Sequence, residues 1–211
     1  MKKYLILLII LIVTVGATST FLEMKPTLKT IYIHSNETDT KLETCHNQSP
    51  ISLAQGIHDI QKTTKTLIEL GETYTVDQNL ATEFKEFDNA YANLQTIISN
   101  LNTCDLKTAN LPDETLAKFD ITTQELVTTL KSEQAAMLNT HQTVIKTIEQ
   151  FLATTENFEK LYYTASTKDA IHYFSDLYTE LDTLSTTYNE YVDARQTYEQ
   201  TKEQLFNQLS N

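Results

Sequence analysis

Apolar side chains in the last third of the chain recur at steps of three and four residues, and this spacing constrains the fold most. Such steps place side chains in one stripe along a helix, which must be buried against other helices. A second stripe covers residues 80–101, and a third, less strict one covers residues 116–162. The longest stripe consists of Phe174, Leu177, Leu181, Leu184, Tyr188, Tyr191, Arg195, Tyr198, Lys202 and Leu205.

Composition and helix-end signals extend this pattern to an all-α fold. The chain has only 3 Gly and 3 Pro in 211 residues, so little interrupts a helix. Pro112, followed by two acidic residues, predicts one helix start, and Ser166 with Asp169 resembles a capping box that starts the last helix at residue 167 or 168. Short polar connections make neighbouring helices antiparallel. We predict an elongated antiparallel helical bundle, a coiled-coil-like rod of three long arms.

The first arm leaves two alternatives open near Gly71. Gly71, a β-favouring run after it and Asp77 are signals for a break, which would give four helices. The apolar stripe can also be continued through residues 71–77, and a continuous arm would match the other two in length, which we favour. The two cysteines distinguish these alternatives. A hairpin folded at Gly71 brings Cys45 and Cys104 to the same end, within disulfide distance, whereas one straight helix separates them.

The N-terminal segment predicts export. Lys2 and Lys3 precede an uncharged stretch over residues 4–22, rich in Leu and Ile. Val15, Gly16 and Ala17 supply a signal-peptide cleavage site, whereas the length of the stretch also fits an uncleaved transmembrane anchor, which we favour. In both cases the positive charges predict that the rest of the chain lies outside the cytoplasm. We therefore divide the chain into a signal peptide or anchor at residues 1–22, an extended tether at 23–51 and a helical bundle domain at 52–211.

The tether carries features of its own. Pro26 and Pro50 bracket it, and the β-branched run at residues 31–33 suggests one short strand. Asn36 and Asn47 each begin a glycosylation acceptor triplet, although such triplets also arise by chance in a chain rich in Thr and Asn.

No residue pattern points to catalysis, to a cofactor or to a metal. The chain has no nucleophile elbow, no phosphate-binding loop and no metal-binding pair of His and Glu on a helix. His141 falls on an apolar helix face, where a lone His is usually a satisfied core residue, although a buried His can also sense pH. The net charge of −12 repels nucleic acid, so we expect no nucleic-acid partner.

Tyrosines are concentrated near the end of the chain. Tyr163, Tyr173 and Tyr178 lie off or beside the main stripe. Exposed tyrosines at helical spacing can anchor a protein partner, and the simpler alternative is a bundle wide enough to bury a second stripe.

No stretch of the sequence matches a family motif. We expect a membrane-anchored or secreted helical bundle with a structural or protein-interaction role at the cell surface or envelope, through a protein partner or self-association. If the N-terminal segment is retained, the membrane is a further partner. The alternative is an extracytoplasmic bundle that binds or senses a small ligand between its helices. Neither interpretation includes an enzymatic activity.

Overall fold

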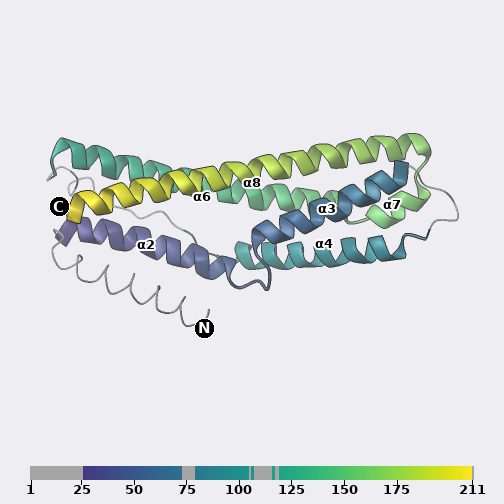
Figure 1. Cartoon of the computed structure of the whole chain (residues 1–211), viewed down its shortest axis with the longest axis horizontal. Coiled ribbons are helices and arrows are strands. Elements are labelled where there is room, and N and C mark those ends of the chain that lie inside the picture. Colours follow the sequence, from purple (N-terminus) through teal and green to yellow (C-terminus); the bar gives the residue numbers. More distant parts are fainter. Residues whose placement is uncertain (1–25, 73–78, 105, 107–115, 117–118, 211) are drawn as a thin grey trace, which may run out of the picture. The chain divides into compact units, whose positions relative to one another are not determined.

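The computed structural model of the chain describes residues 26–72, 79–104, 106, 116 and 119–210, and most of these residues are helical (Figure 1). The predicted all-helical bundle is confirmed for this part of the chain, which contains no strand. The hydrophobic segment at residues 4–22 and the predicted helix start at Pro112 lie outside the described residues. The helices are α2 (Pro26–His46), α3 (Leu53–Glu72), α4 (Ala81–Asn102), α6 (Ile121–Thr155), α7 (Phe158–Thr164) and α8 (Thr167–Ser210).

The expected extended tether with a short strand is wrong, because most of this segment forms helix α2. Residues 26–46 form a helix that begins at Pro26, where the fixed φ of proline suits the first helical turn. One face of α2 is buried at steps of three and four residues, as in the other helices. Two members of this stripe, Ser35 and Thr38, are polar, which hid the period in the sequence. The buried members are Leu28, Ile31, Ser35, Thr38, Leu42 and Cys45.

The favoured continuous first arm is wrong. Helix α3 ends at Glu72 and α4 begins at Ala81, and the two helices pack side by side (Figure 1). Gly56 on α3 permits their close approach, because a Cβ atom there would lie 2.6 Å from Ile97 Cδ1 on α4. Asn100 near the end of α4 donates a hydrogen bond to Ser49 ahead of α3, so the two helices are antiparallel.

The third stripe also divides where the sequence suggested one segment. Helix α6 begins at Ile121 because the Asp120 carboxylate accepts hydrogen bonds from the backbone N–H and the hydroxyl of Thr123, at 3.0 and 2.8 Å. It ends at Thr155, and α7 is a separate short helix. The start of α8 at Thr167 is confirmed: Ser166 Oγ donates to Asp169 Oδ2 at 2.6 Å and accepts from the Asp169 N–H at 3.3 Å.

The chain forms two compact units, and the long helices contribute to both. The larger unit comprises residues 40–106 and 136–194, with α3, α4, α7, the end of α2, the second half of α6 and the first part of α8. Its core is largely apolar and aromatic, with Thr64, His141 and Thr155 also buried. The smaller unit contains the start of α2, the first half of α6 and the last part of α8. Its core includes polar residues such as Gln134 and Thr201.

Candidate functional site

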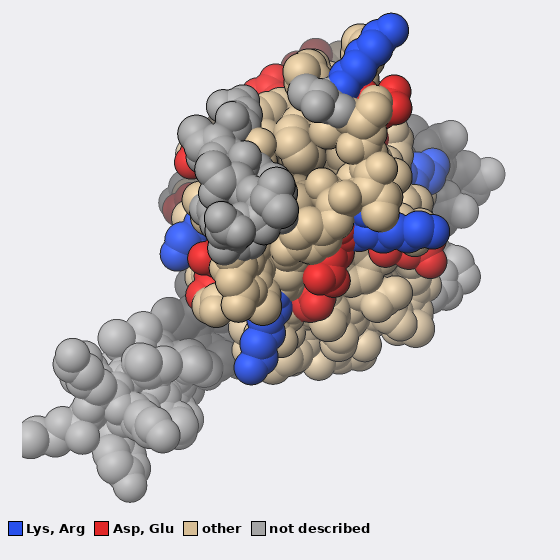
Figure 2. Space-filling model, turned by 90° about the vertical axis from the view of Figure 1, so that its right-hand side faces the viewer, with Lys and Arg blue, Asp and Glu red and all other residues tan. Residues whose placement is uncertain are grey.

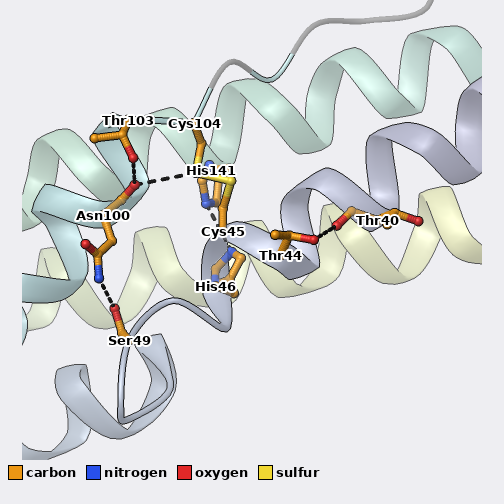
Figure 3. Close-up of a disulfide and its surroundings, with 9 residues drawn as sticks. All are labelled: Thr40, Thr44, Cys45, His46, Ser49, Asn100, Thr103, Cys104 and His141. Carbon is orange, nitrogen blue, oxygen red and sulfur yellow. Dashed lines mark hydrogen bonds between the residues drawn. A yellow bond between two sulfur atoms is a disulfide. The ribbon is translucent and has the colours of Figure 1, made fainter.

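A disulfide joins Cys45 to Cys104 in the larger unit, with their Cα atoms 6.1 Å apart (Figure 3). Cys45 lies in the last turn of α2, and Cys104 follows the end of α4 by two residues. The hairpin of α3 and α4 returns the chain to its starting point, and this brings the two cysteines together. The bond therefore ties the end of α2 covalently to the end of α4.

The two glycosylation triplets occupy different surroundings. Asn47 is exposed in the turn after α2, and Ser49 of the same triplet accepts the hydrogen bond from Asn100 at 2.9 Å. Asn36 is half-buried on α2, and Thr38 of its triplet is buried. Of the two asparagines, Asn47 is the more accessible.

Two histidines meet beside the disulfide. Nε2 of His46, the last residue of α2, lies 3.2 Å from Nε2 of His141 on α6 (Figure 3). The Tyr191 ring on α8 covers both imidazoles, with centroid distances of 6.3 Å to His46 and 5.1 Å to His141. His141 is only 1% exposed. Sequence spacing identified His141 as a core residue, but its partner lies 95 residues away, and no local pattern marks such a pair.

An aromatic cluster occupies the part of the larger unit where α4, α7 and α8 meet. Phe158 of α7 is its centre, 5.1 Å from Phe87 and 5.9 Å from Phe84 on α4. Tyr173 of α8 lies 5.9 Å from Phe158 and donates a hydrogen bond to the carbonyl of Thr154 at 3.0 Å. Burial, with a smaller contribution from the charge of Glu180, raises the pKa of Tyr173 to about 12. Tyr173 is thus half-buried in this cluster.

Tyr163 and Tyr178 belong instead to the surface of the larger unit. Tyr163 is 45% exposed, although its ring also contacts Phe84 at 5.6 Å, and Tyr178 is 37% exposed. Two apolar residues outside the predicted stripes lie on the same two helices, Leu161 on α7 and Ile171 on α8, and Ile171 is 64% exposed. The spacing of seven between Ile171 and Tyr178 was a usable signal. We call these four exposed residues, Leu161, Tyr163, Ile171 and Tyr178, the α7–α8 surface; Leu161 and Tyr163 are two residues apart and lie on different sides of α7.

Charged side chains of both signs are scattered over the end of the larger unit that Figure 2 shows. Figure 2 looks at the end of the larger unit at which α7 lies in Figure 1. Uncharged residues make up most of the visible face, and Lys or Arg and Asp or Glu side chains lie among them as separate groups. Neither charge forms a continuous patch there.

The smaller unit holds a buried ion pair between Asp39 on α2 and Lys202 on α8, whose side chains are only 13% and 14% exposed. Lys202 also lies 3.2 Å from Glu199. Burial raises the pKa of Asp39, only partly offset by the hydrogen bond from Lys202, and the nearby charge of Glu199 raises it further. Burial alone would lower the pKa of Lys202, but its bond to Asp39 and the two carboxylates together raise it. The pKa of Asp39 thus rises chiefly through burial, whereas the pKa of Lys202 rises through Asp39 and Glu199.

Tyr198 completes this polar core. Its hydroxyl accepts a hydrogen bond from Gln134 at 3.3 Å and donates to the Ser35 carbonyl at 3.4 Å. Burial and the charge of Asp39 raise the pKa of Tyr198 above its usual value. The sequence showed Lys202 as an interruption of the last stripe but gave no sign of Asp39, 163 residues away.

The surface has open depressions beside the disulfide and between α2 and α8. One of about 280 Å³ adjoins the disulfide, and one of about 350 Å³ lies between α2 and α8 beside Tyr32 and Phe206. Both are at the lower end of the range for small-molecule sites. Within residues 26–72, 79–104, 106, 116 and 119–210, no three His, Cys, Asp or Glu side chains come together as a metal site.

Helices long and apolar enough to cross a membrane are absent from the described part of the chain. Comparison with known proteins finds no family model, no curated protein and no solved structure that matches this chain.

Proposed function

We propose that this chain is an exported helical protein, membrane-anchored or secreted, with a structural or protein-interaction role at the cell surface or envelope. The observation that carries the proposal is the Cys45–Cys104 disulfide. Disulfides form and persist in oxidising compartments outside the cytoplasm and are rare within it. A disulfide that closes the α3–α4 hairpin therefore supports folding on the far side of a membrane.

The N-terminal sequence supports the same compartment independently. Two lysines followed by the uncharged stretch at residues 4–22 have the order of charge and hydropathy typical of a signal peptide or an N-terminal anchor. In this proposal the bundle is an elongated, coiled-coil-like assembly of antiparallel helices presented outside the cell.

The α7–α8 surface is the region through which we propose that the protein meets a protein partner. Ile171 and Tyr178 recur at helical spacing on α8, and Leu161 and Tyr163 are exposed on the adjacent α7. Tyrosine offers large contact area with few rotatable bonds, and it is enriched among residues that dominate binding energy.

Surface labelling of intact cells tests the compartment. We expect a membrane-impermeant amine reagent to label the full chain. A variant without residues 1–22 should be labelled no more than a cytosolic control protein. Labelling of the full chain only after lysis, with none of the chain in the medium, would contradict the proposal.

Site-specific photo-crosslinking tests the interaction role. A photoreactive amino acid at Tyr163 or Tyr178 should give a discrete crosslinked product in intact cells, whereas the same group at the exposed Asn189 on α8 serves as the matched control. Sedimentation of the purified chain then distinguishes a second copy from another protein. Equal crosslinking at all three positions would remove the proposed role of this surface. A ligand-dependent rise in melting temperature without crosslinking would favour the alternative, a ligand-binding or sensing bundle.

A further inference from the structure

The pair of histidines beside the disulfide forms a contact that can hold one hydrogen-bonding proton but not two. With Nε2 of His46 and Nε2 of His141 3.2 Å apart, a hydrogen bond requires one nitrogen to carry the proton and the other to present its lone pair. A first added proton can bind Nδ1 of the donor ring and leave this bond intact. A second proton on the acceptor Nε2 would point two N–H groups at each other and place two positive rings in contact.

We propose that this pair is a pH-sensitive contact, which packs the last turn of α2 against α6 and α8 at neutral pH and loosens when both imidazoles are protonated. The ordinary pKa of His, about 6.5, places this change in the mildly acidic range. The histidine pair lies in a different part of the larger unit from the α7–α8 surface.

The two rings differ in how easily they can move. His141 lies in the middle of α6 and is 1% exposed, whereas His46 is half-buried at the end of α2. His46 is therefore the ring that leaves when the contact fails. The neighbouring Cys45 stays covalently attached to Cys104, so α2 is loosened but not released.

The charged and titratable groups near the pair in the sequence or in space come from α2, α6 and α8. The Tyr191 ring covers both imidazoles from α8, with Tyr188 6.4 Å beyond it. One turn farther along α8, Arg195 is itself cationic and pairs with Glu199 at 3.8 Å. On α2 the Glu43 side chain is exposed, and the two cysteines do not titrate because they form the disulfide. The residues one turn away from His141 on α6 are buried and apolar: Met137, Leu138, Val144 and Ile145.

Unfolding of the full chain at pH 7.5, 6 and 5, in a buffer with EDTA, tests the proposal. The variant His46→Gln keeps an amide that can hydrogen-bond to His141 but does not take up a proton. Between pH 6 and 5 we expect the unfolding constant of the wild type to rise by up to about tenfold more than that of His46→Gln. The reason is that the folded wild type excludes one proton that the unfolded chain binds, and such a proton changes the unfolding constant about tenfold per pH unit. The variant His58→Gln, at an exposed position on α3, should follow the wild type.

Ring NMR of the wild type decides the question if His46→Gln does not fold. We expect the Cε1–H signals of His46 and His141 to titrate in two separated, mutually dependent steps. Equal pH dependence of the wild type and His46→Gln would overturn the proposal. Independent titration of the two rings in the wild type would overturn it equally.

Discussion

For the buried pair of Asp39 and Lys202, removal of one partner should change the stability of the fold more than removal of both. Both side chains are largely removed from water, so each depends on the other for charge compensation. Removing two charges from water offsets much of their attraction, and a well-packed apolar pair of similar size is often as stable. Leaving one charge behind without its partner is the costly case.

Lys202→Met should therefore lower the free energy of unfolding by about 3 kcal/mol, because it leaves the Asp39 carboxylate buried without its cation. The double variant Asp39→Leu with Lys202→Met should recover most of that loss. Denaturant titration at pH 7 measures both, with Lys146→Met at an exposed position of α6 as the control. A double variant as unstable as the single one would show that the ion pair itself stabilises the smaller unit.

Tyr173 predicts a loss of stability in alkali. Its pKa in the folded chain is raised to about 12, above the value of about 10 for an unfolded tyrosine. A raised pKa means that the folded state holds the proton more tightly, so this contribution is complete below pH 10 and is lost as the pH rises toward 12. Unfolding followed from pH 9 to 12 should show a shallower decline for Tyr173→Phe than for the wild type. Parallel declines would contradict this pKa.

At the scale of the helix, the sequence predicts α8 but not α2, because two polar residues lie in the middle of the buried stripe of α2. The stripe of α8 is apolar through most of its length, and Ser166 with Asp169 marks its start locally. Helix α2 has the same period, but Ser35 and Thr38 occupy two of its buried positions. Binary patterning detects burial only where buried positions are apolar, so a helix completed by polar contacts escapes it.

Gly71, near the end of α3, packs against residues that lie far away in the sequence. A Cβ atom at Gly71 would lie 2.8 Å from Phe174 Cε2 on α8 and 3.2 Å from Tyr162 Cε2 on α7. Sequence signals for the break were present, but the equal length of the three arms outweighed them. The packing of α7 and α8 against the end of α3 could not be derived from local residues.

Gly71→Ala should destabilise the chain although alanine is the better helix former. The intrinsic gain is up to about 1 kcal/mol, whereas overpacking against aromatic rings costs about 1–3 kcal/mol. We expect a net loss in the free energy of unfolding, measured by denaturant titration. Gly71→Ala with Phe174→Leu provides the control, because a smaller side chain at position 174 should reduce the penalty. A stabilised Gly71→Ala would show that Phe174 moves aside freely.

The disulfide should stabilise the fold because it closes the chain segment that contains the α3–α4 hairpin into a loop. Cys45 and Cys104 are separated by 59 positions, and for a loop of this length the chain-entropy relation gives about 4 kcal/mol. Cys45→Ala with Cys104→Ala should lower the free energy of unfolding by about this amount. The wild type in excess reductant should match the variant. An unchanged midpoint in both would mean that the bond adds no stability.

At the scale of the whole molecule, the sequence carried the fold class and the compartment argument, while the candidate sites depended on the fold. The helical periods are local, and so is the charge and hydropathy order of residues 1–22. The His46–His141 contact and the Asp39–Lys202 pair join residues 95 and 163 positions apart. Such pairs become visible only once the helices are assembled. The exposed positions of Tyr163 and Tyr178 likewise follow from how α7 and α8 pack.

The thiol state of the chain in living cells tests the central claim most directly. Cells are quenched in acid and the denatured chain is treated with a thiol reagent that adds mass, with and without prior reduction. We predict that the unreduced wild type gains no mass and that the reduced chain gains two additions, while Cys45→Ala with Cys104→Ala gains none in either case. Two additions on the unreduced wild type would place both thiols in a reducing compartment and contradict the account.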